Sequence, residues 1–97
     1  MYARTISAAL TPGMADEAAR VFNEQVLPII KAQPGFVSSS LMVNVEKNTA
    51  MTVTVWESEE ALTSTGQGSA YLTQAIGHLR GLVVPKTFEH WDVRVSG

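Results

Sequence analysis

Cysteine is absent from this chain of 97 residues. Disulfides and zinc–thiolate sites, which often hold small proteins together, are therefore excluded. The length fits a single domain, residues 1–97, and a domain this short can build only a modest core. Yet 45% of the residues are hydrophobic. Burial of surface against a second copy of the chain is the remaining way to stabilise it, and we expect a homodimer.

Charge of one sign is also lacking, since seven basic residues face nine acidic ones and neither kind clusters. The basic patch expected of a nucleic-acid-binding protein is therefore missing. No apolar run approaches the roughly 20 residues that span a bilayer, and the first residues lack the apolar core of a signal peptide. Glycine-rich phosphate loops and the nucleophile elbow of serine hydrolases are absent too. We expect a cytoplasmic protein with neither nucleic acid nor membrane as a partner.

Apolar residues alternate or recur in patterns that predict four strands and three helical segments. Pro12-Gly13 and Pro34-Gly35 are stop signals on either side of the first helix, and Ser58 and Ser69 are helix N-caps. Pro28 lies inside the first helix, where its missing N–H predicts a bend or loosening. The predicted strands cover residues 2–10, 36–45, 49–56 and 86–95, and the predicted helices cover residues 14–33, 58–65 and 69–79, with an interruption at residues 66–68.

The resulting order is β-α-β-β-α-β, an α+β ferredoxin-like split arrangement. It predicts a four-stranded antiparallel sheet with helices on one face only. The last two predicted strands are apolar on both faces. In the third strand, Met51, Val53 and Val55 point to one face and Trp56 points to the other. In the fourth strand, Trp91, Val93 and Val95 point to one face and Phe88 points to the other. Strands that are apolar on both faces need cover on both. We therefore expect two copies to pack sheet against sheet.

The string Val55-Trp56-Glu57-Ser58-Glu59-Glu60-Ala61-Leu62, after a strand opened by Pro34-Gly35-Phe36, resembles the antibiotic biosynthesis monooxygenase family of dimeric α+β barrels. The resemblance implies a barrel of two packed sheets, with a pocket between sheet and helices in each subunit. Several members oxidise anthrone- or quinol-like aromatics without metal or flavin, and the substrate carbanion gives an electron directly to O₂. The resemblance thus implies a monooxygenase that uses no cofactor.

Certain residues of active relatives are replaced in this chain. The quinol-oxidising relatives commonly carry histidines in the helix after Trp-Glu-Ser, where this chain has Thr65 and Ala70. The haem-degrading relatives have an asparagine in the first strand, where this chain has Ile6, and a helix histidine that ligates iron. No histidine aligns with that position here, so we do not expect haem degradation.

Candidate site residues follow from these placements. Trp56 either anchors the core or stacks against a flat substrate at a pocket wall. Tyr71 and His78 are two helical turns apart, so they share a flank from which either could pass protons, or they are half-exposed surface residues. We expect Ile6 and Phe22 to line the substrate site. The catalytic candidates are His78 and Tyr71.

His90 and Asp92 share a face of the last strand and are the alternative acid–base pair, because a carboxylate can orient a histidine that acts as a base. Cross-strand contacts or solvent explain the pair equally well. Two histidines on separate elements are too few for a metal site, which usually needs three or four ligands. The first hypothesis is a cofactor-independent monooxygenase acting on a small flat aromatic. The alternatives are a non-catalytic ligand-binding or stress-related protein and an acid–base isomerase of the same fold.

Overall fold

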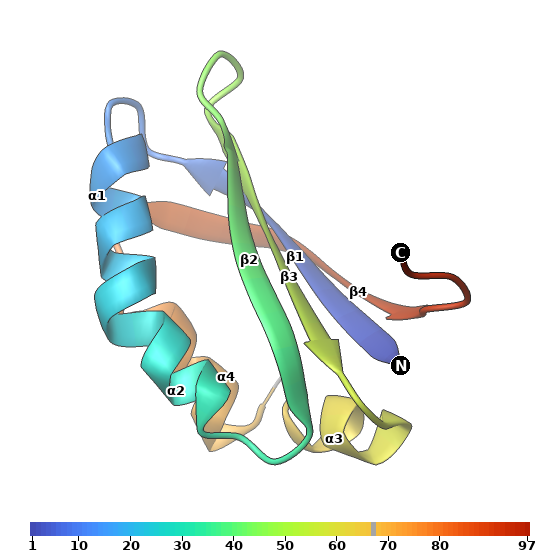
Figure 1. Cartoon of the computed structure of the whole chain (residues 1–97). Helices are drawn as coiled ribbons and strands as arrows, with labels where there is room; N and C mark the ends of the chain where they lie inside the picture. The colour runs from blue at the N-terminus through green and yellow to red at the C-terminus, as the bar shows by residue number, and fades with distance from the viewer. Residues whose placement is uncertain (67) are drawn as a thin grey trace.

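The computed structural model describes residues 1–66 and 68–97; Gln67, inside the predicted interruption, lies outside the described residues. The chain forms a four-stranded sheet with helices on one face (Figure 1). In chain order the elements are β1 (Tyr2–Leu10), α1 (Ala15–Val21), η1 (Phe22–Val26), α2 (Leu27–Lys31), β2 (Phe36–Asn44), β3 (Thr49–Trp56), α3 (Glu59–Ser64), α4 (Ala70–Gly77) and β4 (Val83–Asp92). The predicted fold is confirmed.

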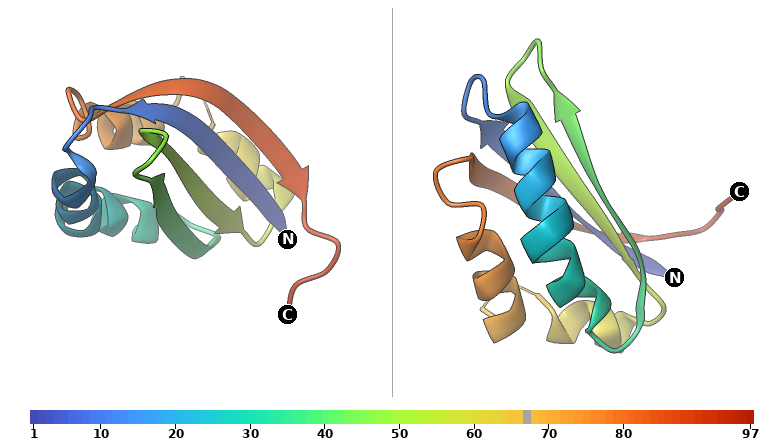
Figure 2. Two further views of the ribbon diagram at one scale, coloured as in Figure 1. Left: turned by 90° about the horizontal axis from the view of Figure 1, so that it is seen from above. Right: turned by 60° about the vertical axis from the view of Figure 1, so that its left-hand side comes forward.

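The sheet has the strand order β2-β3-β1-β4, and every neighbouring pair is antiparallel. This is the order of the ferredoxin-like fold, with β1 and β3 in the centre. The sheet is strongly twisted. α1, η1 and α2 run on from one another as one long helix, and Figure 2 shows this long helix and α4 side by side on the covered face of the sheet. α3 lies at the end of the sheet where β3 finishes (Figure 1).

The first helix begins and ends within a few residues of the prediction, but its middle turn is wider than an α-helical turn. Residues Phe22–Val26 form a π-helical segment, in which the N–H of Leu27 bonds to the carbonyl of Phe22, five residues back. Pro28 follows at once, near the start of α2. The loosening expected from the proline therefore takes the form of a π-helical turn beside it.

The two short helices are capped as predicted. The hydroxyl of Ser58 accepts the N–H of Ala61 at 3.1 Å, and the hydroxyl of Ser69 accepts the N–H of Leu72 at 3.2 Å. Each serine thereby satisfies a backbone donor that the first turn leaves free. These caps fix where α3 and α4 begin.

The last strand differs from the prediction at both ends. It starts at Val83 rather than Lys86 because it pairs with the whole of β1, as far as Leu10. Pro85 is tolerated because β4 is an edge strand, and a register shift lies opposite it at residues 7 and 8. The strand ends at Asp92, so Val93 and Val95 do not belong to it, and Val95 is 91% exposed.

The core lies between the sheet and the helical layer. Its largest fully buried side chain is Trp56, which contacts Phe36 and Tyr71 edge to face with ring centroids 6.3 and 6.0 Å apart. The core cluster consists of Val21, Phe22, Val26, Ile30, Trp56, Ala61, Leu62, Ala75 and Leu79. On the first helix, Ala18 and Val21 are buried, and Ala19 between them is exposed.

The other face of the sheet carries no helix. Met42, Met51 and Trp91 are each more than a third exposed, although large apolar side chains usually avoid water. Trp91 keeps its indole N–H satisfied by donating to the hydroxyl of Thr5 at 2.9 Å. No helix in the described ranges is long and apolar enough to cross a membrane.

Candidate functional site

A cavity of about 60 Å³ lies between the sheet and the helices. Its walls are mainly aliphatic, and its floor is the covered face of β1 and β3. The lining residues from the sheet that belong to its covered face are Arg4, Ile6, Ala8, Leu41, Ala50, Thr52, Thr54, Val83 and Pro85. Those from the helices are Ala18, Phe22, Val26, Ile30, Tyr71, Leu72, Ala75, Ile76 and Leu79. Small residues such as Ala8, Ala18, Ala50 and Ala75 leave this volume empty.

A row of polar side chains crosses the covered face of the sheet at one end of the cavity. Arg4 on β1 lies opposite Thr54 on β3 and His90 on β4 in the strand register. Thr54 in turn shares a hydrogen bond of 2.8 Å with Ser39 on β2. All four strands thus contribute one polar group at the same level. Backbone pairing holds these groups in place, so the row is built into the rigid part of the fold.

Arg4 is the centre of this row and is only 2% exposed. Its Nε donates to Nε2 of His90 at 3.3 Å, its Nη1 donates to Oγ1 of Thr65 at 3.3 Å, and its Nη2 donates to the carbonyl of Leu62. Burial lowers the pKa of the guanidinium, with a smaller opposing effect of Tyr71. An arginine remains charged even so. The site therefore contains a desolvated positive charge.

Thr65 stands where the family resemblance implies a histidine, and the structure gives it a role beside Arg4. Its hydroxyl donates to the carbonyl of Ala61 at 2.8 Å, which turns an oxygen lone pair toward the guanidinium. The threonine is buried, at 4% exposure. It therefore helps to hold Arg4 at the C-terminal end of α3. Ala70, the second such position, is exposed.

Tyr71 lines the same end of the cavity from α4. Burial raises its pKa to about 12, and Arg4 opposes part of that rise. The phenol is therefore protonated at neutral pH. Tyr71 can donate a hydrogen bond to a ligand, but it is not a base.

Among the other predicted residues, Ile6 and Phe22 line the cavity, and Trp56 does not. Trp56 packs behind Tyr71 as a core anchor, and its Nε1 has no hydrogen-bond partner within the described part of the chain. His78 caps the C-terminus of α4, is exposed and lies outside the lining. The expectation that Tyr71 and His78 face a pocket together is thus met by Tyr71 alone.

His90 and Asp92, the alternative acid–base pair, bond to different partners. His90 accepts from Arg4, whereas Asp92 forms an exposed ion pair with Arg94 at 3.1 Å. Burial has the larger effect in lowering the pKa of His90, and the nearby positive charge of Arg4 lowers this pKa further. Neither His90 nor Asp92 lines the cavity. Within the described residues, no group of three metal-ligating side chains comes together.

Sequence reasoning missed Arg4, Thr54 and Ser39. The signal for Arg4 was available, because it alternates in phase with Tyr2 and Ile6 on the covered face of a central strand. A charged residue at such a position is rare unless it is paired. The cross-strand register that brings Thr54 and His90 beside it could not be deduced from the alternation.

Comparisons with known proteins show the family to which the chain belongs. The family model described as antibiotic biosynthesis monooxygenase matches residues 1–73. The chain belongs to the antibiotic biosynthesis monooxygenase family. The matched region includes Arg4, Thr65 and Tyr71 but not His90. A search of curated protein sequences found no match to the chain.

Three solved structures illustrate the range of proteins with this fold. SnoaB, a cofactor-independent oxygenase from Streptomyces nogalater, has 21% identity and a TM-score of 0.71 over 98% of this chain and 95% of its own. A monooxygenase from ActVA-Orf6 of Streptomyces coelicolor, in complex with nanaomycin D, has 21% identity and a TM-score of 0.72 over 98% of this chain and 88% of its own. The haem degrader MhuD from Mycobacterium tuberculosis has 19% identity and a TM-score of 0.74 over 100% and 99%. At these identities the likeness concerns the fold.

Proposed function

We propose that the protein is a cofactor-independent monooxygenase that acts on a small, flat, largely apolar aromatic such as an anthrone or a quinol. One observation supports this above all: the cavity between sheet and helices is mainly apolar, and Arg4, Thr54 and Tyr71 lie together at one end of it. Such a site binds the apolar body of a ligand along the aliphatic walls and orients its oxygen at the polar end. Family membership and the oxygenases of the same fold point in the same direction.

The proposed reaction needs little from the protein beyond orientation and charge. An anthrone that has lost a proton from its central carbon is an electron-rich carbanion, and its charge spreads onto the ring oxygen. It transfers one electron to O₂, the two radicals combine, and the peroxide loses water. The carbon thereby exchanges two hydrogens for one oxygen atom of O₂, and the other oxygen leaves as water. Arg4 and Tyr71 stabilise the charge on the ring oxygen.

The cavity is smaller than ordinary ligand pockets, which have about 300–1,000 Å³. A flat aromatic must therefore separate the helical layer from the sheet in order to enter. The N–H of Val83 on β4 donates to the carbonyl of Leu79, just after α4, at 3.1 Å and ties that end of the helix to the sheet. A small shift of the N-terminal end of α4 is therefore the least costly opening. Closure around the ligand would then exclude water from the reacting carbon.

Oxygen uptake in the presence of anthrones and quinols tests this proposal. We expect uptake and quinone formation with the wild-type protein, a lower kcat in Tyr71→Phe, and unchanged kinetics in the exposed-site variant Arg80→Met. Identical product profiles in the presence and absence of O₂ would refute the oxygenase function.

A non-catalytic binding protein is the second candidate, and one observation favours it. No Asp, Glu, His or Lys is among the residues that line the cavity within the described ranges. A site without a base is suited to retaining a ligand unchanged. Ligand binding detected through Trp56 fluorescence, with no product formed in air, would support this candidate.

We also propose that two copies pair through the uncovered sheet face. Met42, Met51 and Trp91 are exposed there beside the half-buried Val53 and Val55. Contiguous exposed apolar surface of this kind usually marks an interface. Val53→Glu places a charge in the middle of this face and should give a monomer in light scattering. Glu24→Ala, on the far side of the helices, should remain dimeric. A wild-type protein that is monomeric at micromolar concentration would overturn the dimer.

A further inference from the structure

The charge on Arg4 is not balanced by any of the residues that the structure describes. No carboxylate of residues 1–66 or 68–97 lies within ion-pair distance of it. Its three acceptors are an imidazole, a hydroxyl and a backbone carbonyl, all neutral. A buried guanidinium normally has an anionic partner, because desolvation of an isolated charge is costly.

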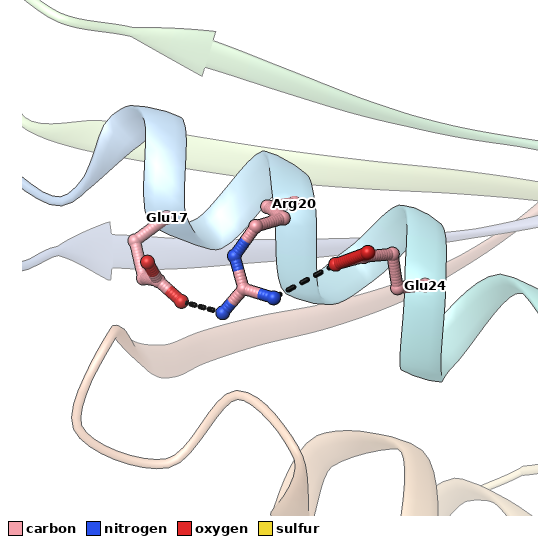
Figure 3. A network of polar contacts seen from close by, with 3 residues as sticks. All are labelled: Glu17, Arg20 and Glu24. Carbon is pink, nitrogen blue, oxygen red and sulfur yellow. Dashed lines mark hydrogen bonds and ion pairs between the residues drawn. The ribbon is translucent and has the colours of Figure 1, made fainter.

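Arg20 provides the contrast within the same chain. It lies on the exposed side of the long helix and bonds to two carboxylates, those of Glu17 and Glu24, the latter at 2.7 Å (Figure 3). The arginine that water already stabilises thus has two anionic partners, and the desolvated one has none. General stability does not explain this distribution, because surface ion pairs contribute little. A ligand that brings its own negative charge to Arg4 does explain it.

The guanidinium also has donors to spare. It carries five N–H groups. Three are used, by His90, Thr65 and Leu62, and no described residue accepts the other two, one on each terminal nitrogen. The backbone register and Thr65 fix the orientation of Arg4 before a ligand arrives. Two N–H groups on a fixed plane match an anionic oxygen or a carboxylate well.

Among the described residues, the cavity lining offers positive charge and no base. Tyr71, the other titratable side chain in this lining, remains a phenol at neutral pH. A weak acid that enters this space therefore cannot hand its proton to a lining side chain. The surroundings favour the molecule that has already lost its proton, and the Tyr71 hydroxyl adds a second donor near Arg4.

We propose that Arg4 is the receptor for an anionic oxygen and that the ligand binds already ionised, as a phenolate, enolate or carboxylate on an otherwise apolar ring. This inference rests on the site described under the proposed function and names its ligand class. The aliphatic walls bind the ring, and Arg4 selects the anion. Ionisation of the substrate then takes place in solution, before binding.

The test uses matched pairs of anionic and neutral probes, measured by titration calorimetry at a pH above the pKa of each acid. The pairs are 4-nitrophenolate with 4-nitroanisole, and 4-nitrobenzoate with its methyl ester. We expect wild-type protein to bind the anion roughly tenfold to a hundredfold tighter than its neutral partner, as charge-assisted hydrogen bonds allow. If only 4-nitrophenolate binds more tightly than its neutral partner, Arg4 selects a phenolate oxygen. If only 4-nitrobenzoate does so, Arg4 selects a carboxylate.

Three variants assign the preference to Arg4. Arg4→Met should reduce it to less than about twofold, Arg4→Lys should retain part of it because Lys keeps the charge but not the planar fork, and Arg80→Met should leave it unchanged. If Arg4→Met does not fold, Arg4→Lys decides: an undiminished preference in that variant contradicts the proposal. Equal binding of anion and neutral partner by the wild type, or no binding of any probe, overturns it.

The outcome is separable from that of the oxygenase proposal. Anion preference without oxygen uptake leaves the Arg4 site standing and removes the oxygenase. Oxygen uptake that is unchanged in Arg4→Met, with no anion preference, removes the Arg4 site and leaves the oxygenase.

Discussion

Nε of Arg4 donates a hydrogen bond to Nε2 of His90 at 3.3 Å, across the pairing of β1 with β4. The bond requires a neutral imidazole with its proton on Nδ1, because a protonated imidazole has no acceptor. The hydrogen bond with the buried Arg4 therefore favours the neutral form of His90 on the edge strand.

The first prediction concerns acid stability. Burial and Arg4 lower the pKa of His90 in the folded state below the usual 6.5, so the unfolded chain binds the proton more readily. The free energy of unfolding should therefore fall as the pH drops below 6.5. The effect should stay below about 1 kcal/mol, because His90 is largely exposed and solvent screens its charge.

Denaturant unfolding between pH 8 and about 5 measures this effect, with the window kept above the usual carboxylate range. His90→Gln should show a weaker pH dependence than the wild type. Equal slopes in the wild type and His90→Gln would contradict the coupling.

The second prediction concerns Tyr71. Its folded-state pKa of about 12 exceeds that of an unfolded tyrosine, so the folded chain retains the proton longer. Stability from this group is present below pH 10 and is lost as the pH rises toward 12. In Tyr2→Phe, which leaves Tyr71 as the sole tyrosine, the ultraviolet phenolate signal should appear near pH 12 if the fold persists. A signal with a midpoint near 10 in protein that is still folded would show that Tyr71 is not desolvated.

The third prediction concerns the cavity. Ala75→Leu projects three extra carbons toward about 60 Å³ of empty space, so it should change stability by no more than about 1–3 kcal/mol. It should abolish binding of 4-nitrophenolate, because the ring and the new side chain compete for one space. Ala70→Leu, on the same helix but exposed, serves as the control and should bind normally. Undiminished binding by Ala75→Leu would place the ligand elsewhere.

The fourth prediction concerns Gly35, which joins the long helix to β2. Its φ is +83°, and an added Cβ would lie 2.6 Å from Cβ of Ala61 on α3. Gly13 has nearly the same φ, at +82°, but an added Cβ there meets nothing within 4 Å. Both alanine variants incur the left-handed backbone cost of about 1–2 kcal/mol, and Gly35→Ala adds an overpacking cost of about 1–3 kcal/mol. Equal losses in urea unfolding would show that α3 moves aside freely.

The fold was predictable because its signals are local. Turn residues such as Pro34-Gly35 and the N-caps Ser58 and Ser69 fix element boundaries, and the alternation in β3 gives its two faces. The first and last residues of β4 could not be predicted from the sequence, because they depend on pairing with the full length of β1 and on tolerance of Pro85 at a sheet edge. Local sequence does not encode that partner.

The candidate site was predicted in part. The apolar lining by Ile6 and Phe22, and the presence of Tyr71, follow from helical and strand periodicity. The polar end did not follow, because Arg4, Thr54 and His90 come from three strands and meet only through register. Histidines are the usual catalytic groups, so residue type alone favoured His78 over an arginine on a central strand.

The π-helical turn can be understood as a one-residue insertion in the first helix. Ala18, Phe22, Val26 and Ile30 recur every four residues and all line the cavity. In a regular α-helix of 3.6 residues per turn, such a row drifts by about 40° at each step and would leave the cavity before its end. The wider turn at Phe22–Val26 corrects that drift. Deletion of Asn23, inside this turn, should restore a regular α-helix and leave Ile30 facing the sheet, because the row then recurs at four, three and four residues, a spacing that a regular helix keeps on one side.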